Sequence, residues 1–367
     1  MAAACRRIPR RRGRHGKRNV AYLSQAVWRS STDSRLGRHA LIFSHAPDWR
    51  GSGYWLIVAA CDFEFELSGM TIFSVHHTTT YRYRRPVRPG LHHLMFRPRD
   101  SFDQRLLECQ LAIEPDPLEV RWIHDVFGNC VALVDFATSS SILRFDTTIR
   151  LDHTPENAPD FRIEDYARSH PFAYDSDELP DLAPYIRRHH PEDIEIDEWL
   201  TKFVATGASK PTGQLLMTLN EAIAEGFSYK RRTPRGTQTP AETLRLQEGT
   251  CRDFALLMME AARSLGFAAR FITGYVYVPD RDGPARLGGG STHAWCQIYV
   301  PGSGWVEFDP TNGIVGNRDL IRVGVARTPQ QAIPLSGTYW GETDDDLGME
   351  VSVNVMTENS KPTQTIP

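Results

Sequence analysis

The strongest constraint on the fold is a change in the period of the apolar residues along the chain. From Met70 the period is two, which places apolar residues on one face of an extended strand and polar residues on the other. The same alternation recurs in three later stretches, at 107–113, 118–122 and 143–151. Several short strands at this spacing, separated by turn signals, predict a small antiparallel β-sandwich over residues 70–152.

Helical periodicity replaces this alternation farther along the chain. Residues 153–191 are rich in Pro, Asp and Glu with little periodicity, so we interpret them as a linker with room for one short helix. Apolar residues then recur at helical spacing within 196–204 and 215–223. We therefore expect an α+β protein, with a second folded region over 192–341 and a C-terminal tail over 342–367.

The first 69 residues differ in composition from everything that follows. Residues 1–69 hold 12 Lys and Arg against 5 Asp and Glu, a balance that also suits a nucleic-acid arm or an organelle transit peptide. We expect this segment to be disordered and interpret much of it as an upstream extension of the gene model. The remaining body has 30 basic and 40 acidic residues, so we exclude nucleic acid as a partner, since phosphate affinity comes from Lys and Arg.

Targeting and cysteine patterns lead us to expect a cytoplasmic protein. The longest early apolar run, Tyr54–Cys61, is much shorter than the ~20 residues that span a bilayer, so no membrane contact is expected. The basic stretch at 6–18 lacks the apolar segment that follows it in a secretory signal. Six cysteines include no CxxC pair, so we expect no disulfide framework, no structural metal and no cofactor. The sequence leaves the oligomeric state open.

One cysteine lies where a helix is predicted to begin. Cys251 follows a glycine turn and opens an apolar helical stripe, with Thr250 as its N-cap and Asp253 returning a hydrogen bond from the first turn. The positive end of a helix favours a thiolate, which is the nucleophilic form of cysteine. Cys251 is therefore a candidate nucleophile, and a structural packing role is the alternative.

A predicted β-hairpin carries two further candidates. Residues 291–309 form two strands separated by a glycine-containing turn, with His293 on the first and Asp309 on the second. The two side chains share a face only if a three-residue loop pairs Val300 with Gly304, since a slip of one residue would turn Asp309 away. A carboxylate beside the imidazole would orient it and stabilise its protonated form, as in a nucleophile, base and orienter triad.

These stretches together resemble a known family. The runs GTCRDFA and STHAWCQIYVPGSGWVEFDPTNG resemble, in order, the Cys, His and Asp boxes of the transglutaminase-like superfamily. The run HHTTTYRYRRPV resembles its bacterial N-terminal region, and ARTPQQAIPLSGTYWG also matches, so the resemblance covers most of 70–341. It implies a papain-like catalytic core at 192–341, with the nucleophile on a helix packed against an antiparallel sheet. Within it, Cys251 would be the nucleophile, His293 the base and Asp309 the orienter.

The resemblance implies attack on an amide carbonyl through an acyl-enzyme thioester. Water would resolve that thioester in a peptidase or amidohydrolase, which we favour, and an amine would resolve it in protein-glutamine cross-linking. A non-catalytic scaffold that keeps the fold is a third hypothesis. The expected partner is a peptide or protein substrate of unknown identity.

Three other features of the sequence bear on this site. Strand alternation sends His293 and Cys296 to opposite faces, so we do not expect a metal there. The glycines at 288–290 lack the signature of a phosphate loop, and we interpret them as a flexible approach to the hairpin. Papain relatives place a glutamine just before the nucleophile as a side-chain oxyanion donor, whereas Arg245 lies six residues upstream of Cys251 here. The sequence does not decide whether Gln247 takes that role, so no side-chain donor is assigned.

Overall fold

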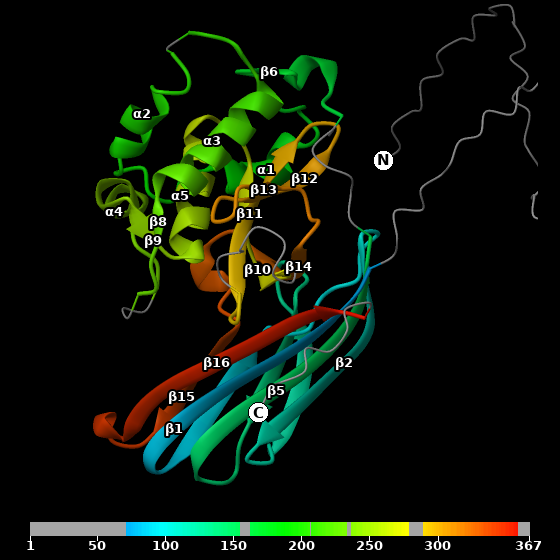
Figure 1. The fold of residues 1–367 in the computed structure, drawn as a ribbon, viewed down its shortest axis with the longest axis vertical. Helices are drawn as coiled ribbons and strands as arrows, with labels where there is room; N and C mark the ends of the chain where they lie inside the picture. Colours follow the sequence, from blue (N-terminus) through cyan, green and yellow to red (C-terminus); the bar gives the residue numbers. More distant parts are fainter. Residues whose placement is uncertain (1–70, 155–161, 206, 233–235, 279–288, 359–367) are drawn as a thin grey trace, which may run out of the picture. The chain divides into compact units, whose positions relative to one another are not determined.

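A computed structural model describes residues 71–154, 162–205, 207–232, 236–278 and 289–358 (Figure 1). The expectations for residues 1–69 and for Gly288 lie outside the described residues. All described residues belong to one compact unit. In this part of the chain, no helix is both long enough and apolar enough to cross a membrane.

The alternating sequence forms a seven-stranded antiparallel sheet. Its strands are β1 (Thr71–Leu94), β2 (Gln104–Glu114), β3 (Glu119–His124), β4 (Cys130–Asp135), β5 (Ser140–His153), β15 (Leu335–Trp340) and β16 (Asp346–Thr357). The main path runs β2-β5-β1-β4-β3, and β15 and β16 both pair with β1. These seven strands are called the β region below.

The β region is one curled sheet, and strand β1 is part of both of its halves (Figure 1). The first half of β1 pairs with β5 and β16, and its last residues pair with β4 and β15. The curl brings β5 toward the end of β4, where the rings of Phe136 and Phe145 meet with centroids 6.4 Å apart. The predicted sandwich thus takes the form of one folded sheet, because the 24-residue β1 continues through the bend.

The C-terminal boundary from the sequence requires correction. The sequence predicts a core that ends at 341 and a tail over 342–367, yet residues 346–357 form β16 and pair with β1 from Phe73 to Tyr83. β15, which had been counted with the core, pairs with the far end of β1. The chain therefore returns to the β region after the core, because β1 would otherwise have a free edge there.

The second region, called the core region below, places helices against a five-stranded antiparallel sheet of order β13-β12-β11-β10-β14. The helices are α1 (Leu179–Ile186), α2 (Glu195–Leu200), α3 (Thr212–Gly226), α4 (Pro240–Leu246) and α5 (Cys251–Ser264). The sheet strands are β10 (Ala269–Val276), β11 (His293–Val300), β12 (Gly304–Asp309), β13 (Ile314–Val315) and β14 (Leu320–Ala326). Short elements complete it: β6 (Ser169–His170), β7 (Lys210–Pro211), β8 (Ser228–Tyr229), β9 (Glu248–Gly249), η1 (Asp165–Ala167) and η2 (Pro329–Gln331). A further turn, η3 (Thr343–Asp345), lies between β15 and β16 in the β region and contacts β1.

Helix α5 is the central element of the core region. Its apolar stripe, which includes Phe254, Leu257 and Met258, is fully buried against residues of β11 such as Cys296 and Ile298. Burial of each such side chain contributes about 1.5–3 kcal/mol relative to leaving it exposed. The helix is therefore held rigidly on the sheet, and its first residue has a defined position beside β11.

The predicted linker is more ordered than its composition indicated. Residues 162–191 contain η1, β6 and α1. Tyr174 donates a hydrogen bond to the Tyr299 carbonyl and accepts one from the Ala268 N–H, each at 2.9 Å. This segment is consequently anchored to the sheet of the core region.

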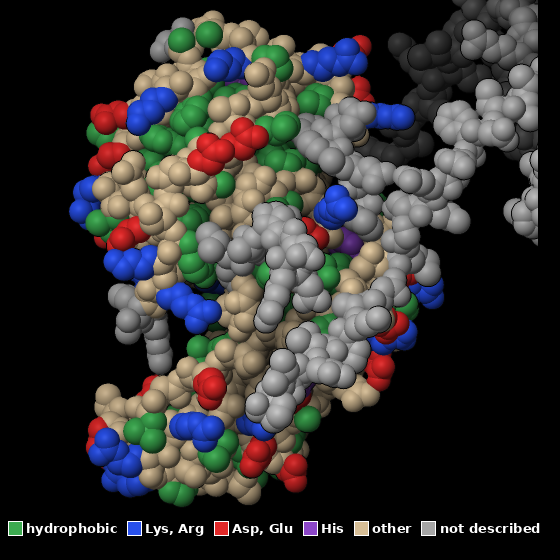
Figure 2. Space-filling view, in the orientation of Figure 1, with side chains coloured by type: hydrophobic (Ala, Val, Ile, Leu, Met, Phe, Trp, Pro, Cys, Tyr) green, Lys and Arg blue, Asp and Glu red, His purple; other side chains and the backbone are tan. Residues whose placement is uncertain are grey.

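The β region and the core region share buried apolar residues. Tyr275, Ile321 and Val323 of the core sheet pack in one cluster with Phe73 and Ile149. On the face shown in Figure 2, Lys and Arg side chains are interspersed with Asp and Glu side chains.

Candidate active site

The start of α5 is organised by Asp253. Its carboxylate accepts hydrogen bonds from the backbone N–H and the hydroxyl of Thr250, both at 2.8 Å. The predicted hydrogen bond from the first turn back to the N-cap is thereby confirmed. Cys251 is the first residue of the helix, and 6% of it is exposed.

Asp253 also holds a distant segment that the sequence did not connect to it. Arg232 donates to both of its carboxylate oxygens, at 3.0 and 3.2 Å, and the Gln238 N–H donates at 2.6 Å. Asp253 is fully buried, so these bonds form in a region of low dielectric, where they are strong. Arg232 was missed in the sequence because it lies 21 positions upstream and in no shared element.

The hairpin has the predicted register. Val300 pairs with Gly304 across a three-residue loop, and Gln297 pairs with Glu307. Gly302 and Gly304 adopt φ values of 91° and 73°, which glycine reaches without a steric penalty. The glycines of this turn therefore provide a local reason for the register that brings His293 and Asp309 to one face.

His293 and Asp309 form a buried pair. His293 Nε2 lies 2.8 Å from Asp309 Oδ2, and neither side chain is exposed. Asp309 also accepts hydrogen bonds from the Thr311 N–H at 2.9 Å and from Asn312 Nδ2 at 2.8 Å. These bonds fix the carboxylate, and with it the plane of the imidazole ring, which stacks on Trp295.

Cys251 approaches the other side of this imidazole. Burial alone would lower the pKa of His293, but the Asp309 carboxylate and the Cys251 thiol together raise it above its usual value. The His293 charge in turn lowers the pKa of Asp309, against the effect of burial. His293 Nδ1 is buried and has no nitrogen or oxygen hydrogen-bond partner among the described residues, so this nitrogen is available to the thiol.

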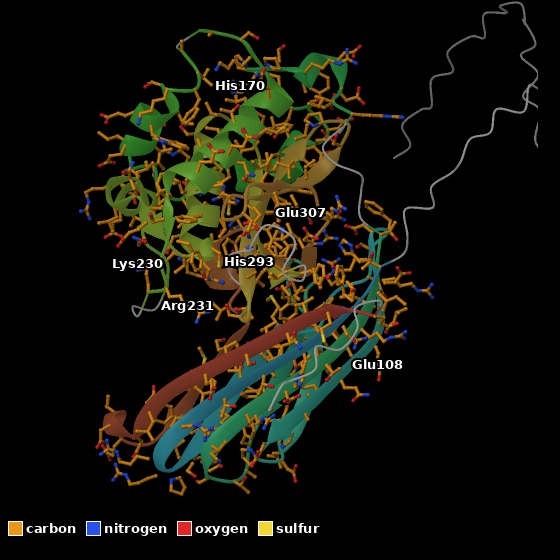
Figure 3. All side chains as sticks on the ribbon, in the orientation of Figure 1. Glu108, His170, Lys230, Arg231, His293 and Glu307 are labelled. Carbon is orange, nitrogen blue, oxygen red and sulfur yellow. The ribbon has the colours of Figure 1, made fainter. Side chains whose placement is uncertain are left out.

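A small cavity joins the thiol and the imidazole. It measures about 190 Å³, and besides Cys251 and His293 its lining includes Arg232, Arg252 and Thr292. In Figure 3, His293 and Glu307 come from neighbouring strands of the core sheet. The three candidate residues thus meet at one site, with Cys251 and His293 on the cavity and Asp309 behind the imidazole.

The two residues considered as oxyanion donors do not line this cavity. Gln247 is exposed and ends α4 in a left-handed conformation with φ 51°. Arg245 is exposed on the last turn of α4. The N–H of Cys251, at the first helical position, has no partner inside the helix and therefore can donate into the cavity.

The group of potential metal ligands found among the described residues does not line this cavity. Cys296 lies on the opposite strand face, as expected, where its thiol contacts the Phe308 carbonyl at 3.5 Å. Among the described residues, three donors that could hold an ion lie within 4.8 Å of one another at His190, Glu192 and Asp193. Asp193 already accepts a hydrogen bond from the Ala241 N–H, so its carboxylate has a structural role.

Two family models match this chain. The model of the bacterial transglutaminase-like N-terminal region matches residues 73–152, and the model of the transglutaminase-like superfamily matches residues 200–310. The second match contains the start of α5 and the complete hairpin.

Individual relatives extend over most of the chain. An uncharacterized protein of Mycobacterium tuberculosis is 26% identical over 305 residues, covering 79% of this chain and 94% of the relative. One of Mycobacterium leprae is 37% identical over 106 residues, covering 29% and 37%. Among solved structures, a "Putative Cysteine Protease" from Cytophaga hutchinsonii matches with a TM-score of 0.61 and 19% identity, covering 80% of this chain and 93% of that one. This likeness shows a shared fold.

Proposed function

Because this chain belongs to the transglutaminase-like superfamily, we propose that it is a cysteine-dependent enzyme that attacks amide or peptide carbonyls. The proposal rests on the two groups that flank the imidazole of His293. Asp309 binds Nε2 at 2.8 Å, and Nδ1 is left for the thiol of Cys251. We assign Cys251 as nucleophile, His293 as acid and base, and Asp309 as the group that orients His293.

The geometry supports a two-step reaction within a papain-like core. The Cys251 thiolate attacks the carbonyl carbon, a C–S bond forms, and the C–N bond breaks as His293 gives its proton to the leaving amine. A water molecule then attacks the thioester carbonyl and gives one proton to His293, the C–S bond breaks, and the carboxylic acid leaves while the Cys251 thiolate re-forms beside the protonated His293. The raised pKa of His293 supports this scheme, because it favours the imidazolium that gives its proton to the leaving amine.

The negative oxygen formed in each step needs hydrogen-bond donors. The Cys251 N–H is one, and loss of a single such donor typically raises the barrier by ~2.7–4 kcal/mol. Arg232 is the best-placed second donor, since its guanidinium lines the cavity and is held by Asp253. Arg252 also lines the cavity, but its guanidinium already donates to the carbonyls of Pro329 and Ala332.

We favour water over an amine as the second reactant, so the activity is that of a peptidase or amidohydrolase on peptide or protein substrates. The solved structure described as a "Putative Cysteine Protease" supports this preference. Cross-linking is the alternative, and it requires a primary amine to reach the same thioester.

Two experiments test the proposal. A thiol-directed electrophile should label Cys251 faster than the half-buried Cys109 and Cys130, and His293→Gln should remove that difference. Equal labelling of all three would favour the scaffold hypothesis. A peptide library incubated with and without a primary amine, and read by mass spectrometry, then separates hydrolysis products from amine adducts.

A further inference from the structure

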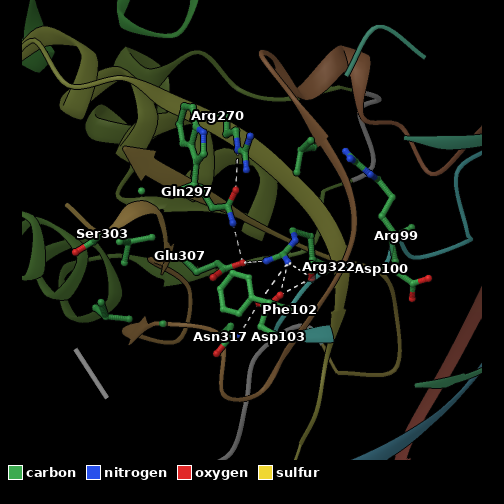
Figure 4. Close-up of a pocket in the computed structure, with 18 of the residues that line it drawn as sticks. Arg99, Asp100, Phe102, Asp103, Arg270, Gln297, Ser303, Glu307, Asn317 and Arg322 are labelled. Carbon is green, nitrogen blue, oxygen red and sulfur yellow. Dashed lines mark hydrogen bonds and ion pairs between the residues drawn. The ribbon is translucent and has the colours of Figure 1, made fainter. Parts of the chain in front are cut away.

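A second and larger cavity lies between the core sheet and the segment that precedes β2. It measures about 730 Å³ and is lined by residues of β10, β11, β12 and β14 and by residues 99–103 (Figure 4). Neither Cys251 nor His293 lines it. Its interpretation is therefore independent of the function proposed above.

Arg270 is the unusual residue of this cavity. Its guanidinium lies over the ring of Trp305, 4.1 Å from the centroid, and its Nε donates to Gln297 Oε1 at 2.7 Å. The amide of Gln297 is held in turn by Glu307, through a hydrogen bond of 2.9 Å. The partners of Arg270 among the described residues are thus an indole and a neutral amide.

The nearby carboxylates are directed to another arginine (Figure 4). Arg322 Nη1 contacts Glu307 at 2.5 Å, and Arg322 Nη2 contacts the two oxygens of Asp103 at 3.0 and 3.3 Å. Asp103 also accepts a hydrogen bond from Asn317 at 2.7 Å. Among the described lining residues, four arginines face three carboxylates, so one positive charge has no matching anion.

A cation in this environment is costly without an anion. Burial, followed by the charge of Arg322, lowers the pKa of Arg270 to about 10, although the charge of Glu307 acts in the opposite direction. A planar guanidinium that is already fixed by stacking can bind a carboxylate through two parallel hydrogen bonds. A ligand carboxylate would therefore restore the balance.

The aromatic side chains of the cavity indicate the chemistry of the rest of the ligand. Trp305 covers one face of Arg270, and Phe102 lines the same cavity with 86% of its surface exposed. An exposed phenylalanine at the rim of a charged cavity can cover an apolar group of a bound molecule. We propose that this cavity binds a carboxylate carried next to an apolar group, with Arg270 as its anchor. A peptide C-terminus and a free carboxylic acid both supply that chemistry.

Calorimetric titration of the full-length Cys251→Ala protein tests the proposal without turnover. The probes are N-acetyl-Ala-Phe, its C-terminal amide and 3-phenylpropionate. The peptide acid should bind about tenfold or more tightly than the amide, the typical effect of a charge-assisted hydrogen bond. Binding of the free acid as tight as that of the peptide acid would identify a small-molecule site, and clearly weaker binding a peptide site.

Variants assign the binding to the cavity. Arg270→Gln should weaken binding of the peptide acid about tenfold or more, to the level of the amide. Arg121→Gln, which changes an exposed arginine of β3, should leave binding unchanged. If Arg270→Gln fails to fold, Phe102→Ala decides, because its exposed side chain can be removed without disturbing the core and should also weaken binding. Equal affinity for acid and amide, no binding, or unchanged binding in Phe102→Ala and Arg270→Gln would overturn the proposal.

Discussion

At the scale of single residues, the site depends on one imidazole with two different neighbours. Asp309 holds Nε2 and is itself held by Thr311 and Asn312, while Nδ1 is left for Cys251. A side chain that both neighbours orient needs little rearrangement when a substrate arrives. Cys251 and Asp309 should therefore differ in how much activity depends on them.

Replacement of the proposed nucleophile should be more harmful than replacement of the proposed orienter. Cys251→Ala removes the thioester route and should leave only background turnover of a peptide substrate. Asp309→Asn keeps the side-chain shape but loses the charge that supports the imidazolium, so turnover should fall by roughly 10³–10⁴-fold and remain above background. Steady-state kinetics on both variants checks the order, and a lower rate for Asp309→Asn than for Cys251→Ala would contradict the assigned roles.

The His293 and Asp309 pair should also make stability depend on pH. The folded pKa of His293 is raised from 6.5 to about 10, so its contribution is complete below pH 6.5 and is lost as the pH rises toward 10. The pKa of Asp309 is lowered from 3.8, so its contribution is lost as the pH falls below that value. In the Cys251→Ala background, Asp309→Asn should therefore destabilise most between about pH 4 and 6.5. Urea unfolding at several pH values measures the difference in the free energy of unfolding between the two proteins. A difference that grows above pH 6.5 would be the opposite of the expected trend.

At the scale of elements, the first turn of α5 depends on a carboxylate that does not react. The buried carboxylate of Asp253 accepts hydrogen bonds from the N-cap residue Thr250, from Arg232 and from the Gln238 N–H. This arrangement links the nucleophile to the segment that forms a wall of its cavity. Its loss should affect both stability and the position of the thiol.

Asp253→Asn should destabilise the protein by roughly 3–5 kcal/mol, because Arg232 keeps its charge and loses its buried partner. Asp165→Asn breaks the exposed ion pair with Arg168 and serves as the matched control, with little change expected. Urea unfolding of both variants measures the difference. Equal effects of the two substitutions would show that Asp253 acts only as a surface charge does.

At the scale of the whole molecule, the last described strand belongs with the first. β16 pairs with β1 over most of its length, and Val353 of β16 is buried in the cluster that also contains core-sheet residues. The end of the chain therefore supports the contact between the β region and the core region.

A chain that ends after Asp345 should lose β16 and expose the edge of β1. We expect a lower unfolding temperature and aggregation, because an unpaired strand edge attracts other chains. A chain that ends at Glu358 retains every described strand and is the control. Thermal unfolding with light scattering checks this, and identical behaviour of the two chains would restore the tail interpretation of residues 342–367.

The sequence by itself determined the features that arise from nearby residues. The alternation from Met70, the hydrogen bond from Thr250 to Asp253, and the register of the hairpin each depend on residues within a few positions or one turn. Steric limits on the backbone and hydrogen bonding of the first helical turn act at this range. The meeting of His293 and Asp309 could be predicted for the same reason, since a three-residue loop joins their strands.

The tertiary structure decided what depends on contacts between distant segments. The pairing of β16 with β1, the bond from Arg232 to Asp253, and the contact of Arg322 with Asp103 join residues that share no local pattern. Any segment that reaches an exposed strand edge can pair with it, and any opposite charge that reaches a buried charge can neutralise it. The composition and the apolar period of a sequence therefore do not identify the partner. The three candidate residues could be identified from the sequence, because local patterns and the family resemblance point to them. The wall of their cavity, the uncompensated charge of Arg270 and the return of the chain to β1 depend on distant contacts and required the folded molecule.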